Sequence, residues 1–195
     1  MKSFEILGAS LWVILLIGIA AFLITAVFIV PLISKISDRR RKPAPIPALG
    51  GKLCTICLAG YTWDKRKDEF DAAIANFLSL DATALKEAEG YVFQYYKDCE
   101  DDWKSYDDEF EPIKSPSDVW KHVRLGSEPR VSRQRNGDKG IYISIECGCD
   151  WEVEHGMQIV FKDGLKLVKV GPCDGHLTNA NAFGDDSLEN TIYKA

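Results

Sequence analysis

The sequence predicts an α+β fold: a single N-terminal transmembrane helix, then helices packed on an antiparallel sheet of hairpins. Three observations support this prediction. The chain begins with a long uncharged apolar segment, continues with two segments of helical periodicity, and ends with alternating apolar segments around turn sequences. Because the helices come before the strands instead of alternating with them, the order favours α+β over a βαβ nucleotide-binding fold.

Composition and charge narrow the class of protein. The chain has 195 residues, of which 46% are hydrophobic, and this excludes collagen-like, low-complexity and disordered proteins. Its net charge of −5 is unevenly distributed: residues 1–42 carry six basic and two acidic side chains, and residues 43–195 carry 18 basic and 27 acidic ones. Since an acidic domain repels phosphates, we expect no nucleic-acid partner.

After a short tail (1–5), residues 6–34 form an uncharged apolar segment. It exceeds the ~20 helical residues that span a bilayer, so it predicts a transmembrane helix. A cleaved signal peptide is the alternative, but its apolar region covers only about 7–15 residues and precedes a small-residue cleavage site.

Basic residues immediately follow this segment and set the predicted orientation. They are Lys35, Arg39, Arg40, Arg41 and Lys42. The positive-inside rule places them, and the domain beyond them, in the cytoplasm, as expected of a single-pass membrane protein. They can also contact anionic lipid head groups, so the lipid bilayer is an expected partner.

A basic, proline- and glycine-rich linker (35–51) leads to the predicted cytoplasmic domain (52–195), which contains all six cysteines. In a reducing compartment, free thiols or metal ligands are expected over disulfides. No cofactor is predicted except zinc, for which two ligand sets exist, with buried or idle thiols as the alternative. The sets are Cys54, Cys57, Cys147 and Cys149, or Cys147, Cys149, His155 and His176.

The first half of the domain predicts one strand and two helices. The strand covers 52–61, and the first helix follows Asp68 with apolar residues at helical spacing, from Phe70 to Leu78. Asp81 caps the second helix, which reaches about Cys99. In the following segment, 98–111, eight of fourteen residues are acidic. The spacing is not that of a calcium loop, so it predicts a solvated helix end or a docking surface for a basic partner.

The second half predicts two β-hairpins. A helix start at Ser115 precedes them. Alternating segments flank the turn sequence 136–140 in one hairpin and 162–164 in the other.

Two polar segments, 146–156 and 171–179, interrupt these hairpins, and both are predicted to lie on one rim of the sheet. The side chains that could carry acid–base or metal chemistry there are Glu146, Asp150, Glu154, His155, Asp174 and His176. Such turn residues also cap strands and satisfy backbone groups, so a structural or partner-binding rim is the alternative. The sequence contains neither a recognised nucleophile motif nor a glycine-rich phosphate loop.

Four segments in this order resemble an uncharacterised bacterial family known as a domain of unknown function. They are SDVWKHV (117–123), EPRVSRQRNGDKGIYIS (128–144), ECGCDWEVEHGMQIVF (146–161) and VGPCDGHLTNANAFGD (170–185). The resemblance covers residues 70–193. It implies a small cytoplasmic α+β protein without an assigned reaction, similar to domains thought to act as toxin-immunity proteins. It also implies a characteristic surface made of Glu146, Asp150, Trp151, Glu154, His155, Gly156, Asp174, Gly175, His176 and Asn179.

We therefore expect a single-pass bacterial inner-membrane protein whose cytoplasmic domain binds a protein partner, in an immunity or regulatory role, without catalysing a reaction. The acidic domain can accelerate association with a basic partner. The alternative is a metal-binding module or metal-dependent enzyme that uses the cysteine, histidine and carboxylate rim.

Overall fold

The structure is a computed structural model that describes residues 39–107, 109 and 111–195. The chain divides into two compact units, Met1–Asp38 and Arg39–Ala195, and the described residues all belong to the second. The predicted tail 1–5, the predicted span 6–34 and the predicted lipid-contacting residue Lys35 lie outside the described residues.

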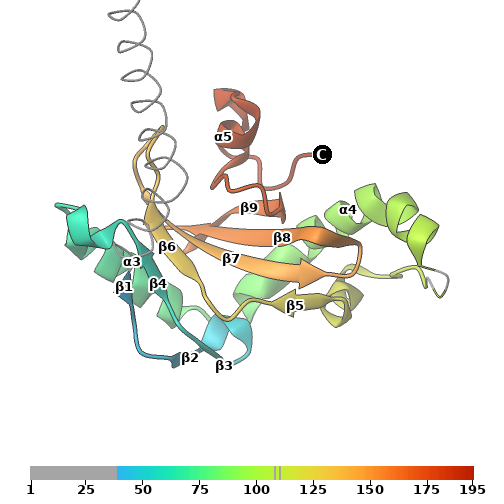
Figure 1. Cartoon of the computed structure of the whole chain (residues 1–195), viewed down its shortest axis with the longest axis horizontal. Helices are drawn as coiled ribbons and strands as arrows, with labels where there is room; N and C mark the ends of the chain where they lie inside the picture. Colours follow the sequence, from blue (N-terminus) through green and yellow to red (C-terminus); the bar gives the residue numbers. More distant parts are fainter. Residues whose placement is uncertain (1–38, 108, 110) are drawn as a thin grey trace, which may run out of the picture. The chain divides into compact units, whose positions relative to one another are not determined.

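The unit is built on a mixed sheet whose strands are hydrogen-bonded in the order β1-β4-β6-β7-β8-β9, with β5 also paired to β7 (Figure 1). The strands are β1 (Arg39–Arg40), β4 (Cys57–Ala59), β5 (Val123–Leu125), β6 (Arg130–Arg133), β7 (Ile141–Cys149), β8 (Glu152–Lys162) and β9 (Lys166–Pro172). A separate hairpin consists of β2 (Ala44–Ile46) and β3 (Lys52–Cys54), joined by the short helix η2 (Pro47–Leu49). Residues 39–51, which the sequence predicted to be a linker, thus contribute to the folded unit.

The predicted fold class is wrong because the sheet is not purely antiparallel. Both predicted hairpins form, as β6–β7 and β8–β9. However, β4 pairs parallel to β6, with Leu58 opposite Val131. The chain leaves β4, passes through two helices and returns to the same sheet, which is the long crossover that a parallel pair requires. The predicted strand at 52–61 is also split, since β3 belongs to the small hairpin and β4 to the main sheet.

The structure also corrects the predicted single-pass inner-membrane localisation. Within the part of the chain that the structure describes, no helix combines the length and apolarity needed to cross a bilayer. Of the basic residues predicted to face lipid, Arg40 pairs with Glu128 and Arg41 with Asp71, while Lys42 is exposed. Arg39 belongs to β1, which pairs with β4. Arg40 and Arg41 thus have ion-pair partners within the folded unit, and the backbone of Arg39 pairs with β4.

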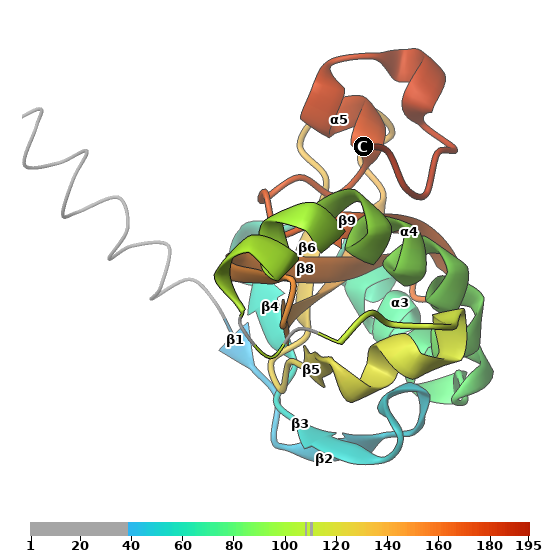
Figure 2. The same cartoon turned by 90° about the vertical axis from the view of Figure 1, so that its right-hand side faces the viewer.

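Two helices cover one face of the sheet (Figures 1 and 2). Helix α3 (Lys67–Ser79) buries Phe70, Ala73, Ile74 and Phe77, which share one helical face. The Phe77 ring lies 5.7 Å from the Phe161 ring of β8. Helix α4 (Thr83–Tyr106) begins where the Asp81 carboxylate accepts the backbone N–H of Thr83 at 2.9 Å. It extends beyond the predicted end at Cys99 and carries the first part of the acidic segment, residues 98–106, on its last turns.

The remaining elements complete the unit at both ends of the sheet. The short helix η3 (Tyr61–Trp63) precedes α3, and η4 (Pro116–Lys121) begins at the helix start predicted from Ser115. Beyond β9, the chain forms α5 (Asn179–Phe183) and η5 (Asp186–Leu188) and returns along the edge of β9. There the Val170 N–H donates to the Ile192 carbonyl at 2.8 Å.

Glycine is required in the turn that joins β8 to β9. Gly164 has φ +73°, and a Cβ there would lie 1.9 Å from the Ala73 carbonyl oxygen of α3. We expect Gly164→Ala to lower the free energy of unfolding by about 2 kcal/mol, because it combines left-handed backbone strain with displacement of a helix. Gly175→Ala is the control, since Gly175 has φ +78° but a Cβ added there would meet no atom within 4 Å, and it should cost about 1 kcal/mol. Equal losses in urea titrations of the two variants would contradict this account.

Candidate functional site

The β7–β8 hairpin tip contains the first group of predicted site residues. Asp150 lies in the turn, and its carboxylate contacts two residues of neighbouring segments, His122 at 3.2 Å from Nδ1 and Arg124. Its backbone N–H also donates to the His122 carbonyl at 3.1 Å. Asp150 thus attaches the hairpin tip to η4 and β5.

Trp151 is a core residue of this tip rather than a surface residue. Its side chain is only 1% exposed. Its ring lies 5.8 Å from the Tyr96 ring and 6.2 Å from the Tyr95 ring, both on α4. Within the described residues, its indole N–H has no hydrogen-bond partner. Trp151 therefore fixes the hairpin against α4 and is not available to a partner.

Glu154 and His155 are exposed on the first residues of β8. The Glu152 carboxylate accepts both of their backbone N–H groups at 3.0 Å. The His155 side chain is 68% exposed, and its Nδ1 lies 3.5 Å from the same carboxylate. This geometry orders the tip and leaves the side chains of Glu154 and His155 facing solvent.

The C-terminal half of α4 lies beside this tip. Asp98, Asp102 and Tyr106 are spaced four residues apart, so they share one face of the helix. The Tyr106 hydroxyl donates to the Trp151 carbonyl at 3.2 Å, which joins the helix to the hairpin. Burial, and after it the negative charges of Glu152, Asp102 and Asp98, raises the pKa of the Cys99 thiol to about 11. The carboxylates of the helix and the hairpin therefore act on the same region.

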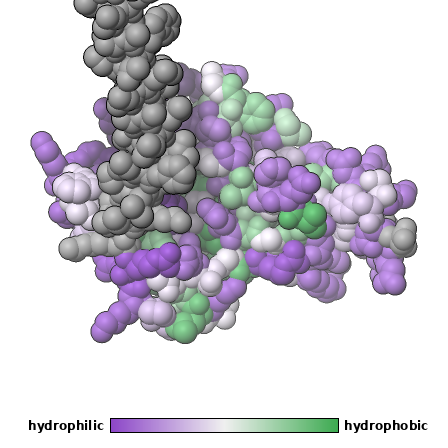
Figure 3. All heavy atoms as spheres, in the orientation of Figure 1, coloured by the Kyte–Doolittle hydropathy of each residue, from purple (hydrophilic) through white to green (hydrophobic). Residues whose placement is uncertain are grey.

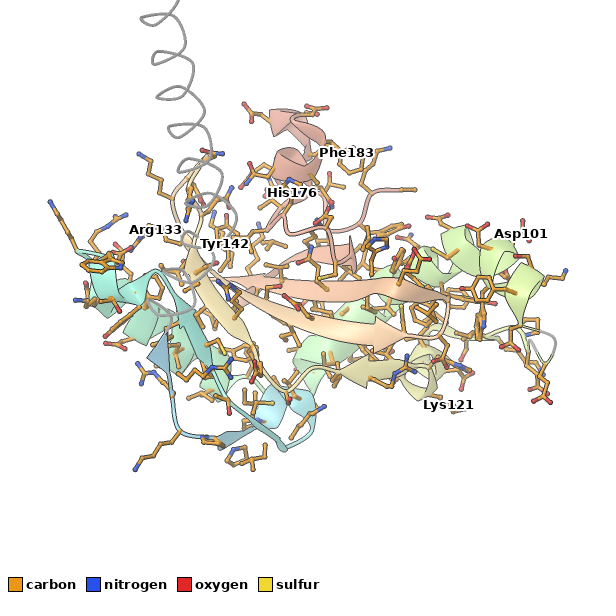
Figure 4. The ribbon with its side chains drawn as sticks, in the orientation of Figure 1. Asp101, Lys121, Arg133, Tyr142, His176 and Phe183 are labelled. Carbon is orange, nitrogen blue, oxygen red and sulfur yellow. The ribbon has the colours of Figure 1, made fainter. Side chains whose placement is uncertain are left out.

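We call this region the acidic end. It comprises Asp98, Asp101, Asp102 and Tyr106 of α4 together with Glu152, Val153 and Glu154 of β8. Asp101 points away from the sheet at the right-hand end of Figure 4. In Figure 3 this end of the described unit is mainly hydrophilic. Two apolar side chains are nevertheless exposed on it, Tyr106 at 54% and Val153 at 67%.

The second group of predicted residues belongs to the loop after β9, which a buried ion pair holds in place. Lys169 is 1% exposed, and its ammonium donates to both carboxylate oxygens of Asp174 at 2.6 and 2.7 Å. Gln158 is 2% exposed and donates to the same carboxylate at 2.9 Å. Both side chains also donate to the His176 carbonyl, at 3.3 Å from Lys169 and 3.0 Å from Gln158.

The charges of this pair follow from its surroundings. Burial lowers the pKa of Lys169, and the Asp174 carboxylate offsets only part of that effect. Burial is the largest single effect and would raise the pKa of Asp174, but the Lys169 hydrogen bonds, the His176 N–H and the charge of Lys169 together outweigh it, so this pKa lies below its ordinary value. Asp174 therefore remains ionised at neutral pH and serves as the counter-ion of a buried lysine.

The other predicted residues of this group have structural or exposed positions. The His176 backbone N–H donates to Asp174 at 2.9 Å, while its half-exposed ring lies with Nδ1 3.6 Å from that carboxylate. Asn179 is 3% exposed and donates to the Thr191 carbonyl at 2.8 Å. Glu146 is exposed on β7, and its charge raises the pKa of Cys173 beyond the effect of burial. The contacts thus connect Asp174 with His176 and Asp150 with His122, and they do not join the two groups.

The proposed zinc ligands are not gathered. Across the described ranges, no group of three or more histidine, cysteine or acidic residues could hold a metal ion. All six cysteines are free thiols. Cys147 and Cys149 are buried on the core face of β7, where burial raises their pKa values to about 11 and about 12. The Cys54 thiol contacts the Gly126 carbonyl at 4.0 Å and the Cys57 thiol contacts the Thr55 carbonyl at 3.7 Å.

Sequence reasoning missed Lys169, Gln158 and His122. Lys169 occupies a polar position in an alternating strand, which is typical of a solvent-facing residue. A register shift between Val160 and Phe161 places it opposite Val160, on a face that the loop after β9 covers. The acidic residues of α4 were visible in the sequence, but their proximity to Glu152 depends on how the hairpin packs.

Comparisons with known proteins complete the description of the site. The model of a family described as "Domain of unknown function (DUF6985)" matches residues 32–177. That range includes the hairpin tip, the acidic segment of α4 and the buried ion pair. No curated protein and no solved structure matches the chain.

Proposed function

The chain belongs to the DUF6985 family of domains of unknown function, and we propose that it is a binding protein whose acidic end takes a basic segment of another protein. One observation supports this proposal above the others. Exposed carboxylates from two different elements surround Tyr106 and Val153, which expose 54% and 67% of their surface. The immunity or regulatory role implied by the sequence resemblance would follow from covering the partner's active surface.

In such an interface, charged side chains increase the association rate, and exposed apolar side chains provide contact area. The carboxylates of Asp101, Asp102 and Glu154 provide a negative field that increases the association rate with a positive partner. Tyrosine is enriched in binding hot spots because it combines a large apolar ring with a polar hydroxyl. In the acidic end, Tyr106 and Val153 provide area that can be desolvated, and the charged rim selects a basic partner.

The acidic end is also held rigidly. The Tyr106 hydroxyl bonds the Trp151 carbonyl, and the buried Trp151 ring packs on Tyr95 and Tyr96. A surface that is ordered before association loses less conformational entropy on binding. Helix α4 and the hairpin tip can therefore bind as one preformed surface.

Site-specific photocrosslinking in the native cell tests the proposal. A photoreactive phenylalanine analogue is placed at Tyr106 or Val153 in the full chain, and at Phe183 as a control. Phe183 is 52% exposed but lies in α5, outside the acidic end. We expect a discrete protein adduct from positions 106 and 153 and none from position 183. An adduct from all three positions, or none from 106 and 153, would contradict the proposed surface.

The charge requirement is tested on the same adduct. The double change Asp102→Asn with Glu154→Gln should reduce its yield several-fold, and added salt should reduce the wild-type yield, because both weaken long-range attraction. Asp186→Asn is the matched control, since Asp186 is exposed in η5. An adduct that is insensitive to salt and to the double change would reject a basic partner.

A further inference from the structure

A cavity of about 290 Å³ lies where η2, the first turns of α4, η4 and β5 meet. Its walls are mainly apolar. The lining residues are Leu49, Gly50, Ala82, Leu85, Lys86, Glu89, Trp120, Val123 and Leu125. None of them belongs to the acidic end or to the ion pair after β9.

Some polar groups in the cavity wall have hydrogen-bond partners among the described residues. The Trp120 indole N–H donates to the Glu89 carboxylate at 3.0 Å, which orients the ring and provides Glu89 with a hydrogen bond. Lys52 donates to the Leu125 carbonyl, so that acceptor is also occupied. Lys86 lines the cavity and is an exposed residue, and within the described part of the chain its ammonium takes part in no salt bridge.

We propose that this cavity binds a small apolar carboxylic acid, with the hydrocarbon part against Leu85, Trp120 and Val123 and the carboxylate on Lys86. Ligand pockets are typically apolar with a few polar groups that orient the ligand. Here the aromatic and aliphatic walls provide the apolar part, and Lys86 provides the orienting charge.

The volume limits the size of the ligand. An apolar cavity of about 150 Å³ is large enough to bind benzene. A cavity of about 290 Å³ therefore accommodates two fused rings or an alkyl chain of similar volume. Naphthalene-2-carboxylate matches this size and charge, and its uncharged amide is a probe of nearly identical shape.

Saturation-transfer difference NMR with both probes on the purified full chain tests the proposal. We expect saturable binding of the carboxylate, and binding of the amide that is about tenfold weaker because it forms no charge-assisted contact. Lys86→Gln should weaken carboxylate binding by about the same factor and leave amide binding unchanged. Lys104→Gln is the matched control, because Lys104 is an exposed lysine on the last turns of the same helix.

A blocking variant tests the location. Ala82 is exposed at the start of α4, so Ala82→Phe can fill the cavity without burying a new polar group. It should abolish binding of both probes while circular dichroism and the thermal midpoint remain unchanged. Three results would each overturn the proposal: no saturable binding of the carboxylate, equal binding of acid and amide, or probe binding that survives Ala82→Phe in a folded protein.

Discussion

Replacing Asp174 by alanine is expected to lower the free energy of unfolding by about 3 kcal/mol at neutral pH. The change leaves the ammonium of Lys169, which is 1% exposed, without its counter-ion. An unpaired buried charge is costly because the protein interior solvates it poorly. Asp174 is itself 30% exposed, which places the expected loss at the lower end of the range for buried pairs.

A double-mutant cycle separates this pair from other effects of the loop. Lys169→Met removes the buried charge, so adding Asp174→Ala to it should cost at least about 1.5 kcal/mol less than Asp174→Ala alone. Asp71→Ala is a control, because Asp71 forms an exposed ion pair with Arg41 and should cost below about 1 kcal/mol. Urea titrations provide all four free energies. Strictly additive losses would show that Lys169 and Asp174 are not energetically coupled.

The loss of stability caused by Asp174→Ala is expected to decrease at acidic pH. The pKa of Asp174 is lower in the folded protein than in the unfolded chain. Its contribution is therefore fully present above the unfolded pKa of about 3.9 and is lost as pH falls through the folded pKa. The difference between wild type and Asp174→Ala should thus be constant near neutrality and shrink in acid. A difference that grows in acid would contradict the depressed pKa.

Local patterns explain which parts of the fold the sequence predicts. Helix α3 follows from Phe70, Ala73, Ile74 and Phe77, whose spacing defines one buried helical face regardless of the rest of the chain. The β6–β7 and β8–β9 hairpins follow from alternating segments beside turn residues such as Asp163 and Gly164, which adopt φ of +51° and +73°. These elements depend on interactions between residues close in sequence.

The missed features depend on contacts between distant segments. The pairing of β4 with β6 joins Leu58 to Val131 across the two helices, and no local periodicity encodes it. The short strand β1 is also defined only by its partner β4. The predicted antiparallel sheet failed for this reason, since adjacent hairpins are the pairings that a sequence pattern shows most directly.

In the candidate site, too, local features are predictable from the sequence and features that depend on distant contacts are not. The acidic composition of residues 98–111 is a local property and was visible in the sequence. Which polar-segment residues are exposed depends on packing: Trp151 is buried on α4, whereas Val153 two residues later is 67% exposed. The sequence of the polar segment contains both apolar residues, but it does not predict which of them packs against α4.

Raising the pH from about 8 to about 10.5 is expected to lower the free energy of unfolding by several kcal/mol, in large part through buried thiols, two of which lie on the core face of β7. Cys147 and Cys149 are 6% and 0% exposed on the core face of β7. Burial raises their pKa values to about 11 and about 12. A thiol in the unfolded chain has a pKa of about 8.5.

Stability falls at alkaline pH because the folded protein retains thiol protons that the unfolded chain loses. Above about pH 8.5 the unfolded chain loses thiol protons that the folded protein retains, so stability falls as pH rises. The fall continues until the folded pKa is reached. Each pH unit in this window costs about 1.4 kcal/mol per thiol, which gives about 2.5 kcal/mol for each thiol by about pH 10.5.

Replacing both thiols distinguishes their contribution from that of the tyrosines. Burial also raises the pKa of Tyr96 to about 12, and tyrosines of the unfolded chain ionise only near pH 10. Cys147→Ala with Cys149→Ala should therefore reduce the loss between about pH 8.5 and 10, leave the part that other, partly buried thiols such as Cys99 contribute, and retain the steeper loss above about pH 10. Urea titrations in the presence of a reducing agent measure both curves. Parallel pH profiles for the wild type and the double variant would show that these thiols do not govern the alkaline loss of stability.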